Sequence, residues 1–554
     1  MSSPSRRTFL TQSAIALAGL TSGVGHRAFG MARLPIRSQQ PVASFFPELI
    51  AADTLQALAT TGVDAARQAG AEYADIRLTD LRLLRLGIEL GDSGVPTIVG
   101  NIPGAAITFE LSYGIRARVG GAWAFVTGNE CTSDAVAAAG RRAAATARGV
   151  AASVRQPWEM VAAPAVRGEW TTPVRVDPFA VSPDAHVNIL GALYDVGARA
   201  TGATAWPRVT WTGETRVFAS TDGSLTTQHL THALPSIYID AKTGVPRVPD
   251  VMLRFRDINP ISAGLEIFEG AALQERLKAA AADAIPLLQF PIGAADVGRY
   301  EAVFDGTSMG AMAAYTLAPA LELRRVLGYD ADGVGTSILA PTADVLGAPL
   351  FAPCLTLTSD RSMPQYGAVQ WDDEGVVPRS FPLIANGAVV DYFSTRATAG
   401  ALASWYSKTG RPLASQGTTI AQSPSTPPRA RATDLVIASG ASGTTLDTLI
   451  RGVKRGVLVR SLEYVSSDQQ LSGGAFFPEM LFEITRGKIT RRLIDSGVQF
   501  GTKSFWKGIT TMGDASTVEY GVARRYPNAG TIEYTPVRAP AAHVARLDVI
   551  QRNG

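Results

Sequence analysis

The segments that decide the fold are 300–339, YEAVFDGTSMGAMAAYTLAPALELRRVLGYDADGVGTSIL, and 357–393, LTSDRSMPQYGAVQWDDEGVVPRSFPLIANGAVVDYF. The first segment opens with an apolar strand and passes through a Gly-Thr-Ser turn into a helix. The second contains the acidic turn WDDEG, followed by short strands that Gly and Pro separate. Together they predict a β-rich domain with a helix after its first strand.

The part of the chain that precedes these segments mixes helices and strands. Apolar residues at helical spacing predict helices at 53–70, at 132–148, from about 182, and at 264–285. Alternating apolar and polar residues predict a pair of strands in 70–92, a hairpin in 107–129 that turns at Gly120-Gly121, and further strands in 209–242. The fold class is therefore α+β.

A domain boundary is expected within 286–299, where two prolines and two glycines precede a fresh strand. We divide the chain into an N-terminal segment 1–30, a linker 31–50, an N-terminal domain 51–290 and a β-rich C-terminal domain 291–554. Residues 409–431 are rich in Ser, Thr and Pro, which favours a surface loop.

The charge of the chain gives no support for binding to nucleic acid. There are 51 basic and 48 acidic residues, and Arg6, Arg7 and Arg27 lie in a first segment of 30 residues that contains no acid. The remainder therefore has 48 residues of each sign. A neutral chain lacks the basic surface that nucleic-acid binding requires, so we expect no such partner.

The N-terminus has the features of an export signal. SRRTFL at 5–10 matches the twin-arginine (Tat) pattern, a short apolar stretch follows at 14–20, and Ala28-Phe29-Gly30 is suited to cleavage. The apolar stretch is shorter than the roughly 20 residues that a membrane-spanning helix needs. We expect a bacterial protein that is periplasmic or secreted and has no membrane span.

The two cysteines, Cys131 and Cys354, form no metal-binding pair in the sequence. A disulfide between them is compatible with the periplasm, whereas two buried thiols are the simpler expectation. The sequence leaves both possibilities open.

Ser308 lies in GTSMG at 306–310, which satisfies the GxSxG pattern of a nucleophile elbow between a strand and a helix. A serine hydrolase also needs a histidine base, and His543 is the only histidine downstream. The simpler interpretation is a strand-to-helix turn that caps the helix. His229 and His232 are three residues apart on an expected strand, where their side chains point to opposite faces and do not share a metal.

Several segments resemble the TldD/PmbA family, also called peptidase U62 or modulator of DNA gyrase. They occur in the order and spacing of the family across roughly 50–510: YADIRL, YGIRARVGGAWAF, VRGEWTTPVRVDPFAV, VGRYEAVFDG, WDDEG, FPLIANGAVVDYF and FEITRGKI. The resemblance implies a zinc metallopeptidase fold in which a helix carries HExxxH and a cysteine near the C-terminus completes the metal site.

The positions that match the metal-binding helix carry other residues here. Ala314 and Pro319 stand where the family has its two histidines, and Tyr315 stands where it has the glutamate. The C-terminal region contains no cysteine. Glu322 remains on the same helix, but one carboxylate is not a zinc site. We therefore expect no bound metal, although zinc is the cofactor of the family.

The resemblance also indicates which other residues lie near the groove of the family. These are the acidic turn, Asp372, Asp373 and Glu374, and the segment that contains Arg429 and Asp434. The turn has an alternative interpretation as a solvated loop that Gly375 closes. Asp434 stands where the family usually has Asn, which puts a polar substrate contact there in question.

Two functions remain open at this stage. The first is an exported partner or pseudo-peptidase that has no zinc, binds peptide or unfolded polypeptide, and forms a homodimer or a heterodimer with a TldD/PmbA homologue. The second is an active peptidase or other hydrolase that uses Ser308 or a carboxylate pair.

Overall fold

The computed structural model describes residues 30–32, 39–90, 96–99, 107–154, 159–199, 204–241, 251–254, 260–269, 271–361, 366–460, 462, 464–525 and 533–551. The expected export signal before Gly30 lies outside these residues. None of the described helices is long and apolar enough to cross a bilayer.

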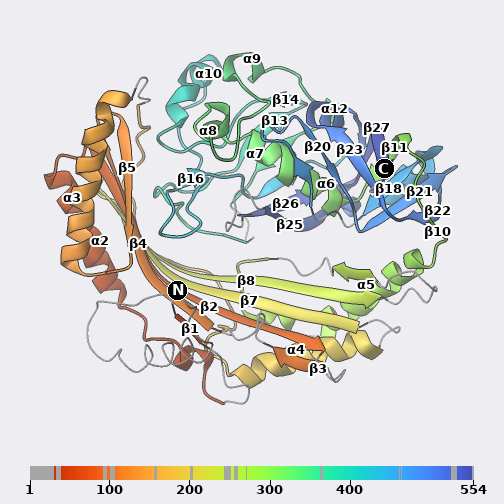
Figure 1. Ribbon diagram of the computed structural model, residues 1–554, viewed down its shortest axis with the longest axis horizontal. Helices are drawn as coiled ribbons and strands as arrows, with labels where there is room; N and C mark the ends of the chain where they lie inside the picture. Colours follow the sequence, from red (N-terminus) through yellow and green to blue (C-terminus); the bar gives the residue numbers. More distant parts are fainter. Residues whose placement is uncertain are drawn as a thin grey trace, which may run out of the picture.

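The N-terminal part of the chain forms one long, curved sheet (Figure 1). The strands run in the order β1-β4-β2-β7-β8-β6, while β3 pairs with β2, β5 with β4 and β9 with β8. Their bounds are β1 Gly30–Ala32, β2 Tyr73–Leu90, β3 Pro96–Val99, β4 Ile107–Val119, β5 Ala122–Gly128, β6 Arg167–Thr171, β7 Thr204–Ser220, β8 Leu225–Ala241 and β9 Val251–Arg254.

Helices cover one face of this sheet. They are α2 Ala52–Gln68, α3 Ser133–Val150, α4 Pro183–Arg199 and α5 Ala271–Leu288, with short 3-10 turns at Val42–Phe45, Ala151–Ser153 and Leu265–Phe268. The helix α3 begins as expected, because the Thr132 side chain accepts a hydrogen bond from the Ala135 N–H. The apolar residues of α2 and α3 pack on alternate residues of β2 and β4.

Two sequence-based expectations in this half need correction. The expected pair of strands in 70–92 is the single strand β2, because no turn residue interrupts it and it pairs continuously with β7 from Asp75 to Gly87. The helix expected at 264–285 is α5, which begins at Ala271 and continues through Pro286. The hairpin in 107–129 is confirmed: Gly120 and Gly121 have φ of 56° and 80°, which suits the tight turn between β4 and β5.

The C-terminal part contains most of the short strands, as expected. One sheet has the order β10-β22-β21-β18-β11-β27-β23-β20-β19, and β24 also pairs with β27. Its bounds are β10 Ile292–Gly293, β11 Gly298–Phe304, β18 Arg455–Arg460, β19 Ser466–Ser467, β20 Gly473–Phe476, β21 Met480–Thr485, β22 Lys488–Leu493, β23 Ser496–Gly501, β24 Ile509–Met512 and β27 Ala542–Gln551.

A second C-terminal sheet has the order β14-β13-β12-β17-β26-β25, and a small separate hairpin pairs β15 with β16. The bounds are β12 Leu357–Ser359, β13 Phe381–Ala385, β14 Ala388–Val389, β15 Thr419–Ile420, β16 Arg429–Ala430, β17 Leu435–Ile437, β25 Glu519–Arg525 and β26 Glu533–Ala539.

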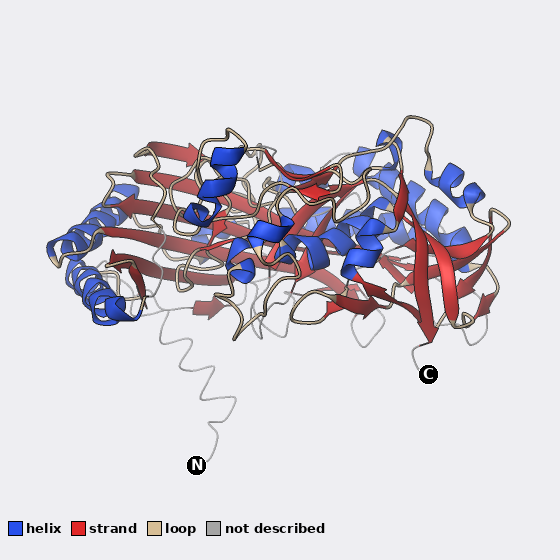
Figure 2. Cartoon of the chain, turned by 90° about the horizontal axis from the view of Figure 1, so that it is seen from above, coloured by secondary structure: helices blue, strands red, loops and turns tan. Residues whose placement is uncertain are grey.

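The helices of the C-terminal part are short. They are α6 Gly306–Met312, α7 Ala318–Ala320, α8 Leu323–Val326, α9 Thr342–Val345, α10 Ala403–Lys408, α11 Leu446–Gly452 and α12 Thr502–Lys507, with a π turn at Ala313–Leu317 and 3-10 turns at Ala399–Leu402 and Ala515–Thr517. The segment from α6 to α7 is buried in the largest apolar core, and α6 contacts strands of both C-terminal sheets, β25 and β26 of one and β18 of the other. Figure 2 shows the helices and strands of the chain from above.

The face of the long sheet that its helices leave open meets the C-terminal part. Residues of β2 alternate, so Ala74, Ile76 and Leu78 lie in the apolar core while Asp75 and Arg77 point to the opposite face. On that face the Arg77 guanidinium donates to the Thr426 carbonyl, in the segment between β15 and β16. Residues 409–431 are therefore not the expected surface loop, because this part of the segment is inserted against the sheet.

Candidate functional site at the junction of the two parts

The helix that follows β11 is filled with apolar packing at the positions where metal ligands were sought. Ala314 and Pro319 are buried in the core. Tyr315 is also buried, and its hydroxyl donates to the Arg524 carbonyl at 2.5 Å. These side chains offer no ligand for a metal.

The backbone of this helix departs from α geometry at the same place. The Ala318 N–H bonds to the Ala313 carbonyl, five residues back, which makes Ala313–Leu317 a π turn. A cause is present in the sequence: Pro319 has no N–H, and its ring would collide with the Tyr315 carbonyl in a regular α-helix. Residues 314 and 319, five apart, are consequently about one turn apart along the helix.

Glu322, the acidic residue that follows the 314–319 segment, forms an ion pair with Arg431. Arg431 Nη1 lies 3.5 Å from Glu322 Oε2 and 2.8 Å from Glu533 Oε1. Both carboxylates are almost fully buried, with side chains 3% and 6% exposed. Within the described residues no group of three His, Cys, Asp or Glu side chains is arranged to hold a metal ion. The residues present do not fit the zinc site of the family.

Ser308 is fully buried at the start of α6. Its N–H donates to the Asp305 carboxylate at 2.8 Å, as in a helix cap, and its Oγ accepts from the Leu462 N–H at 3.3 Å. His543 lies on β27 and bonds instead to Thr510 Oγ1 at 2.6 Å. Asp305 is therefore the residue that caps α6, and Ser308 is a buried residue of the first helical turn rather than a nucleophile paired with a base.

The strand histidines also have separate partners. His229 contacts Thr215 and Glu169, whereas His232 bonds to Ser262 Oγ at 2.8 Å. Burial lowers the pKa of His232 to about 4, so its ring is neutral near pH 7. The two histidine rings therefore have different partners, on different parts of the chain.

The acidic turn 372–375 is buried, which contradicts its alternative interpretation as a solvated loop. Asp372, Asp373 and Glu374 are 3–4% exposed. The Asp372 carboxylate accepts the N–H groups of Val376, Glu374 and Thr419 at 2.9–3.0 Å. Burial and the nearby Glu374 carboxylate raise the pKa of Asp372, and these three N–H groups oppose that rise.

Asp373 and Glu374 reach the polar face of the long sheet. Asp373 lies 3.2 Å from Arg216 of β7 and accepts the Ala421 N–H at 2.7 Å. Burial alone would raise the pKa of Asp373, but Arg216 and Arg77 outweigh it and hold that pKa below its usual range.

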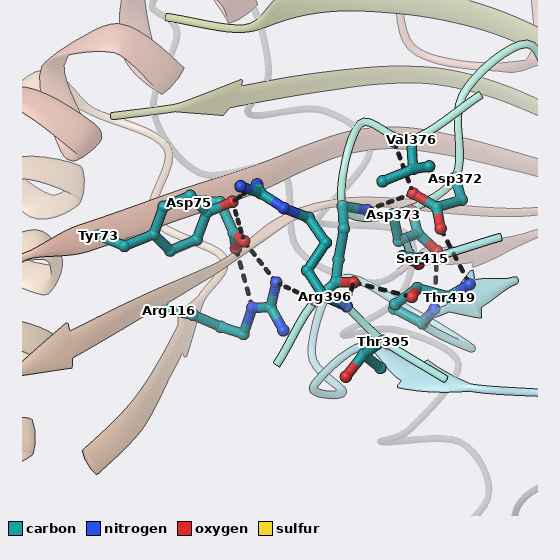
Figure 3. Close-up of polar contacts among 12 residues, drawn as sticks. Tyr73, Asp75, Arg116, Asp372, Asp373, Val376, Thr395, Arg396, Ser415 and Thr419 are labelled. Atoms are coloured by element: carbon teal, nitrogen blue, oxygen red, sulfur yellow. Dashed lines mark hydrogen bonds and ion pairs between the residues drawn. The ribbon is translucent and has the colours of Figure 1, made fainter. Parts of the chain in front are cut away.

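Glu374 completes an ion cluster with Arg116 and Asp75 (Figure 3). Asp75 and Arg116 are directly opposite each other on β2 and β4, and Arg116 Nε donates to Asp75 Oδ1 at 3.0 Å. Arg116 Nη2 also lies 3.2 Å from Glu374 Oε1. The other Glu374 oxygen accepts from the Thr419 hydroxyl and the Arg396 N–H. Every charge of this cluster has a partner, as burial requires.

Gly375 ends the acidic turn with φ of +73°, a conformation that favours glycine. An added Cβ would lie 2.7 Å from Phe218 Cε1 on β7. The turn therefore approaches the long sheet as closely as a residue without a side chain permits.

Next to this cluster a pocket of about 200 Å³ opens between the two parts of the chain. Its walls come from β7, β8, the described residues between Arg361 and Val369, the β15–β16 segment, the residues between β16 and β17, and β26. The lining includes Glu214, Arg216, His232, Arg361, Tyr366, Gln422, Arg431, Thr433, Asp434, Glu533 and Tyr534.

Of the candidate residues named from the sequence, the structure places only Asp434 in the lining of this pocket. Its φ of +48° suits Asp or Asn, which adopt this conformation more readily than other residues with side chains. Burial raises the pKa of Asp434 to about 7, although Arg361 opposes the rise. Arg429 points elsewhere and lies 3.5 Å from Asp330, which also pairs with Arg324.

The residues that sequence reasoning missed are the arginines that hold the junction together. Arg116, Arg216 and Arg431 each contact two carboxylates. A signal for them was present in YADIRL, where Asp75 and Arg77 form a polar stripe on a strand whose other face is apolar.

Comparison with known proteins gives a consistent result. Residues 297–551 match the family described as the PmbA/TldA metallopeptidase C-terminal domain. No curated protein sequence matches.

The cysteines in this fold are free thiols, Cys131 buried and Cys354 exposed, so the expectation of two buried thiols is only half correct.

Three solved structures are similar to this chain. TldE from Thermococcus kodakarensis is 17% identical, with a TM-score of 0.60 and coverage of 89% of this chain and 99% of that one. A protein named as a candidate modulator of DNA gyrase from Bacteroides thetaiotaomicron is 15% identical, with a TM-score of 0.60 and coverage of 90% and 98%. One with the same name from Thermotoga maritima is 14% identical, with a TM-score of 0.61 and coverage of 89% and 100%.

Proposed function

Because this chain carries a PmbA/TldA metallopeptidase C-terminal domain and has a TldD/PmbA-like fold, we propose that it is an exported member of this family that binds peptides without a zinc site of its own. It acts as a metal-free partner or as a pseudo-peptidase. The proposal rests on the helix segment 314–319, in which Ala314, Tyr315 and Pro319 are buried.

The charge balance around this helix supports the proposal. A catalytic metal ion neutralises the carboxylates that surround it. Here the Arg431 guanidinium offsets one of the two negative charges of Glu322 and Glu533. A divalent cation placed beside these carboxylates would also meet the positive charge of Arg431, which makes its binding weaker than it would be beside two carboxylates alone.

The junction between the two parts supports peptide binding. Its pocket combines donors, acceptors and aromatic rings, the mixture that polar ligands with an apolar surface require. The pocket is small enough to take one side chain or one end of a peptide. A longer unfolded polypeptide would lie along the junction.

The first test is zinc stoichiometry on protein that lacks residues 1–30. The purified chain is incubated with zinc, dialysed and assayed for metal by mass spectrometry. We expect near zero zinc per chain. About one tightly held zinc per chain would contradict the proposal and would require ligands other than those at 314–319.

The binding and partner roles need a separate measurement. Fluorescently labelled, unfolded casein is titrated with the chain alone and with a TldD/PmbA homologue that carries HExxxH, and size-exclusion chromatography reports whether the chains associate as a homodimer or a heterodimer. Binding of casein without cleavage by the chain alone is the expected result. Cleavage that persists in the presence of a chelator would instead favour the alternative hydrolase.

Export is tested with the full chain in a bacterial host. Replacing Arg6 and Arg7 by lysine retains the charge but removes the twin-arginine pair that the Tat pathway recognises. We expect the unmodified chain in the periplasmic fraction and the double variant in the cytoplasm. Equal distribution of the two proteins would refute Tat export.

A further inference from the structure

Within the described part of the chain, the carboxylate of one buried acid in the junction pocket, Asp434, has no hydrogen bond and no ion pair, and nearby arginines act on it only through their charge. Other charged groups of the pocket walls form ion pairs. Arg216 contacts Glu214 at 2.6 Å and Asp373 at 3.2 Å, and Arg431 bridges Glu322 and Glu533. Each of these two guanidiniums contacts two carboxylates, so an incoming anion would compete with existing ion pairs, although Arg431 Nε has no hydrogen-bond partner in the described structure.

Arg361 is held in a different way. Its Nη1 donates to the Gly417 carbonyl at 3.2 Å and its Nη2 donates to the Gly367 carbonyl at 3.1 Å. These two bonds fix the guanidinium against the loop that precedes the acidic turn. Arg361 acts on Asp434 through its charge, because no hydrogen bond joins the two side chains in the described part of the chain.

Asp434 is 2% exposed, and in the described structure its carboxylate has neither a hydrogen bond nor an ion pair. The main chain of the same residue is fixed, since its carbonyl accepts the Asp360 N–H at 2.8 Å. The neighbouring Thr433 hydroxyl is buried in the same wall and is also without a hydrogen-bond partner among the described residues. Arg361 Nε and Arg431 Nε, in the same lining, are also buried without a hydrogen-bond partner in the described structure. Buried polar groups are normally satisfied, so these groups together with the Asp434 carboxylate indicate a missing ligand.

The rest of the lining indicates what kind of donor is missing. Tyr366 and Tyr534 lie with their ring centroids 5.1 Å apart in the same pocket, and Tyr366 also packs on His232 at 5.4 Å. Aromatic faces attract cations, whereas a neutral hydroxyl or amide gains nothing comparable from them. A carboxylate beside tyrosine rings is therefore best satisfied by a cationic donor.

We propose that this pocket binds a primary ammonium group, that the Asp434 carboxylate is its anchor, and that the group is the free amino terminus when the ligand is a peptide. The peptide part of this inference rests on the proposed function, whereas the ammonium part stands on the pocket alone. The volume of about 200 Å³ suits the ammonium and a few atoms behind it.

Ammonium binding should displace a proton from Asp434. The charged and titratable groups that face this residue are Arg361, Asp360, Arg538 and Tyr520. Burial raises the pKa of Asp434 to about 7, while Arg361 and Arg538 lower it and Asp360 raises it. The empty pocket therefore holds a proton below neutral pH, and the ligand must compete with it. Affinity for an ammonium should rise about tenfold from pH 6 to pH 8 as the carboxylate ionises.

The test uses n-butylamine, whose amine resembles that of a lysine side chain and stays protonated over this pH range. Its matched control is n-butanol, which has the same shape but no charge. Binding is measured by calorimetry on the chain that lacks residues 1–30. We expect butylamine to bind, butanol not to bind, and the affinity to increase from pH 6 to pH 8.

Two variants locate the anchor. Asp434→Asn keeps the shape and tolerates the φ of +48°, so it should fold and lose at least tenfold in affinity together with the pH dependence. Asp360→Asn removes a charge outside the pocket lining that raises the pKa of Asp434, so it should retain binding at pH 8 and weaken the dependence on pH. The inference is overturned if butylamine binds more weakly than about 10 mM, if butanol binds equally well, or if Asp434→Asn binds like the parent.

A peptide pair separates this inference from the proposed function. A labelled peptide with a free amino terminus is compared with its N-acetylated form. If both bind equally, peptide binding stands and the amino-terminal anchor fails. If neither binds while butylamine still depends on Asp434, the pocket stands and the peptide-binding function fails.

Discussion

Replacing Arg116 by alanine should destabilise the junction strongly. The Arg116 side chain is 9% exposed, and it contacts the carboxylates of Asp75 and Glu374, whose side chains are 0% and 1% exposed. Its removal leaves Asp75 with the Tyr73 hydroxyl at 3.0 Å and no opposite charge in contact. Breaking a buried ion pair from one side costs about 3–5 kcal/mol, because the remaining charge stays in a poorly solvated place.

Arg118 provides a matched control on the same strand and the same face. It lies 3.0 Å from Glu72, but the Glu72 side chain is 49% exposed and water can replace the contact. Arg118→Ala should therefore cost about 0–1 kcal/mol. The two variants delete the same side chain two residues apart, so they differ chiefly in the burial of the partner.

Urea denaturation followed by tryptophan fluorescence measures both variants, with far-UV circular dichroism to identify the transition of the long sheet. A double-mutant cycle with Asp75→Asn separates the pair from its surroundings, and the combined loss should be smaller than the sum of the single losses. If Arg116→Ala costs no more than Arg118→Ala, the buried cluster does not hold the two parts together and our reasoning is wrong.

Three further predictions concern the pocket, the acidic turn and the helix. Burial raises the pKa of Asp434 to about 7 in the folded chain, whereas an aspartate in the unfolded chain has a pKa near 4. Asp434 therefore lowers the free energy of unfolding as pH rises from about 4 to about 7. Asp434→Asn should remove this loss and stabilise the chain at pH 8 by up to about 4 kcal/mol, which urea titrations at pH 5 and pH 8 would measure. Gly375→Ala should lower the thermal stability more than Gly367→Ala. Both glycines have positive φ, which costs an alanine about 1–2 kcal/mol of strain, but only the Gly375 variant adds a Cβ 2.7 Å from Phe218. Equal losses of stability in thermal unfolding would contradict the close approach of this turn to the long sheet. Arg431→Ala should lose about 3–5 kcal/mol because two buried carboxylates lose their contact with its guanidinium. Arg429→Ala should lose little because Asp330 keeps Arg324; chemical denaturation compares the two variants, and similar losses would argue against the role of Arg431.

Much of the fold could be predicted from the sequence because its signals are local. Gly120-Gly121 marks a tight turn, and Thr132 is a helix cap that the structure confirms. Residues 70–92 were expected to form two strands because a strand this long is rare, whereas the structure has a single strand in which Asp75 and Arg77 form a polar stripe. The start of α5 was misplaced because Leu265–Phe268 continues the helical spacing as a separate 3-10 turn.

The candidate site was harder to predict because its residues come together only through tertiary packing. The absence of metal ligands at 314–319 could be read directly from the sequence. The burial of the acidic turn could not, since Asp372, Asp373 and Glu374 find their partners on strands more than 150 residues earlier and in the 409–431 segment. That segment has the composition of a surface loop, and its burial depends on a polar face of the sheet that composition does not reveal.

The π turn at Ala313–Leu317 makes this helix sensitive to changes in length. Removing one residue of the turn would leave Pro319 in the helix and would rotate the residues that follow by about 100°. Glu322 would then turn away from Arg431, and the buried charge would lose its counterion. Substitution can therefore alter the chemistry of positions 314–319 while the backbone stays the same, but a single deletion would rephase the helix.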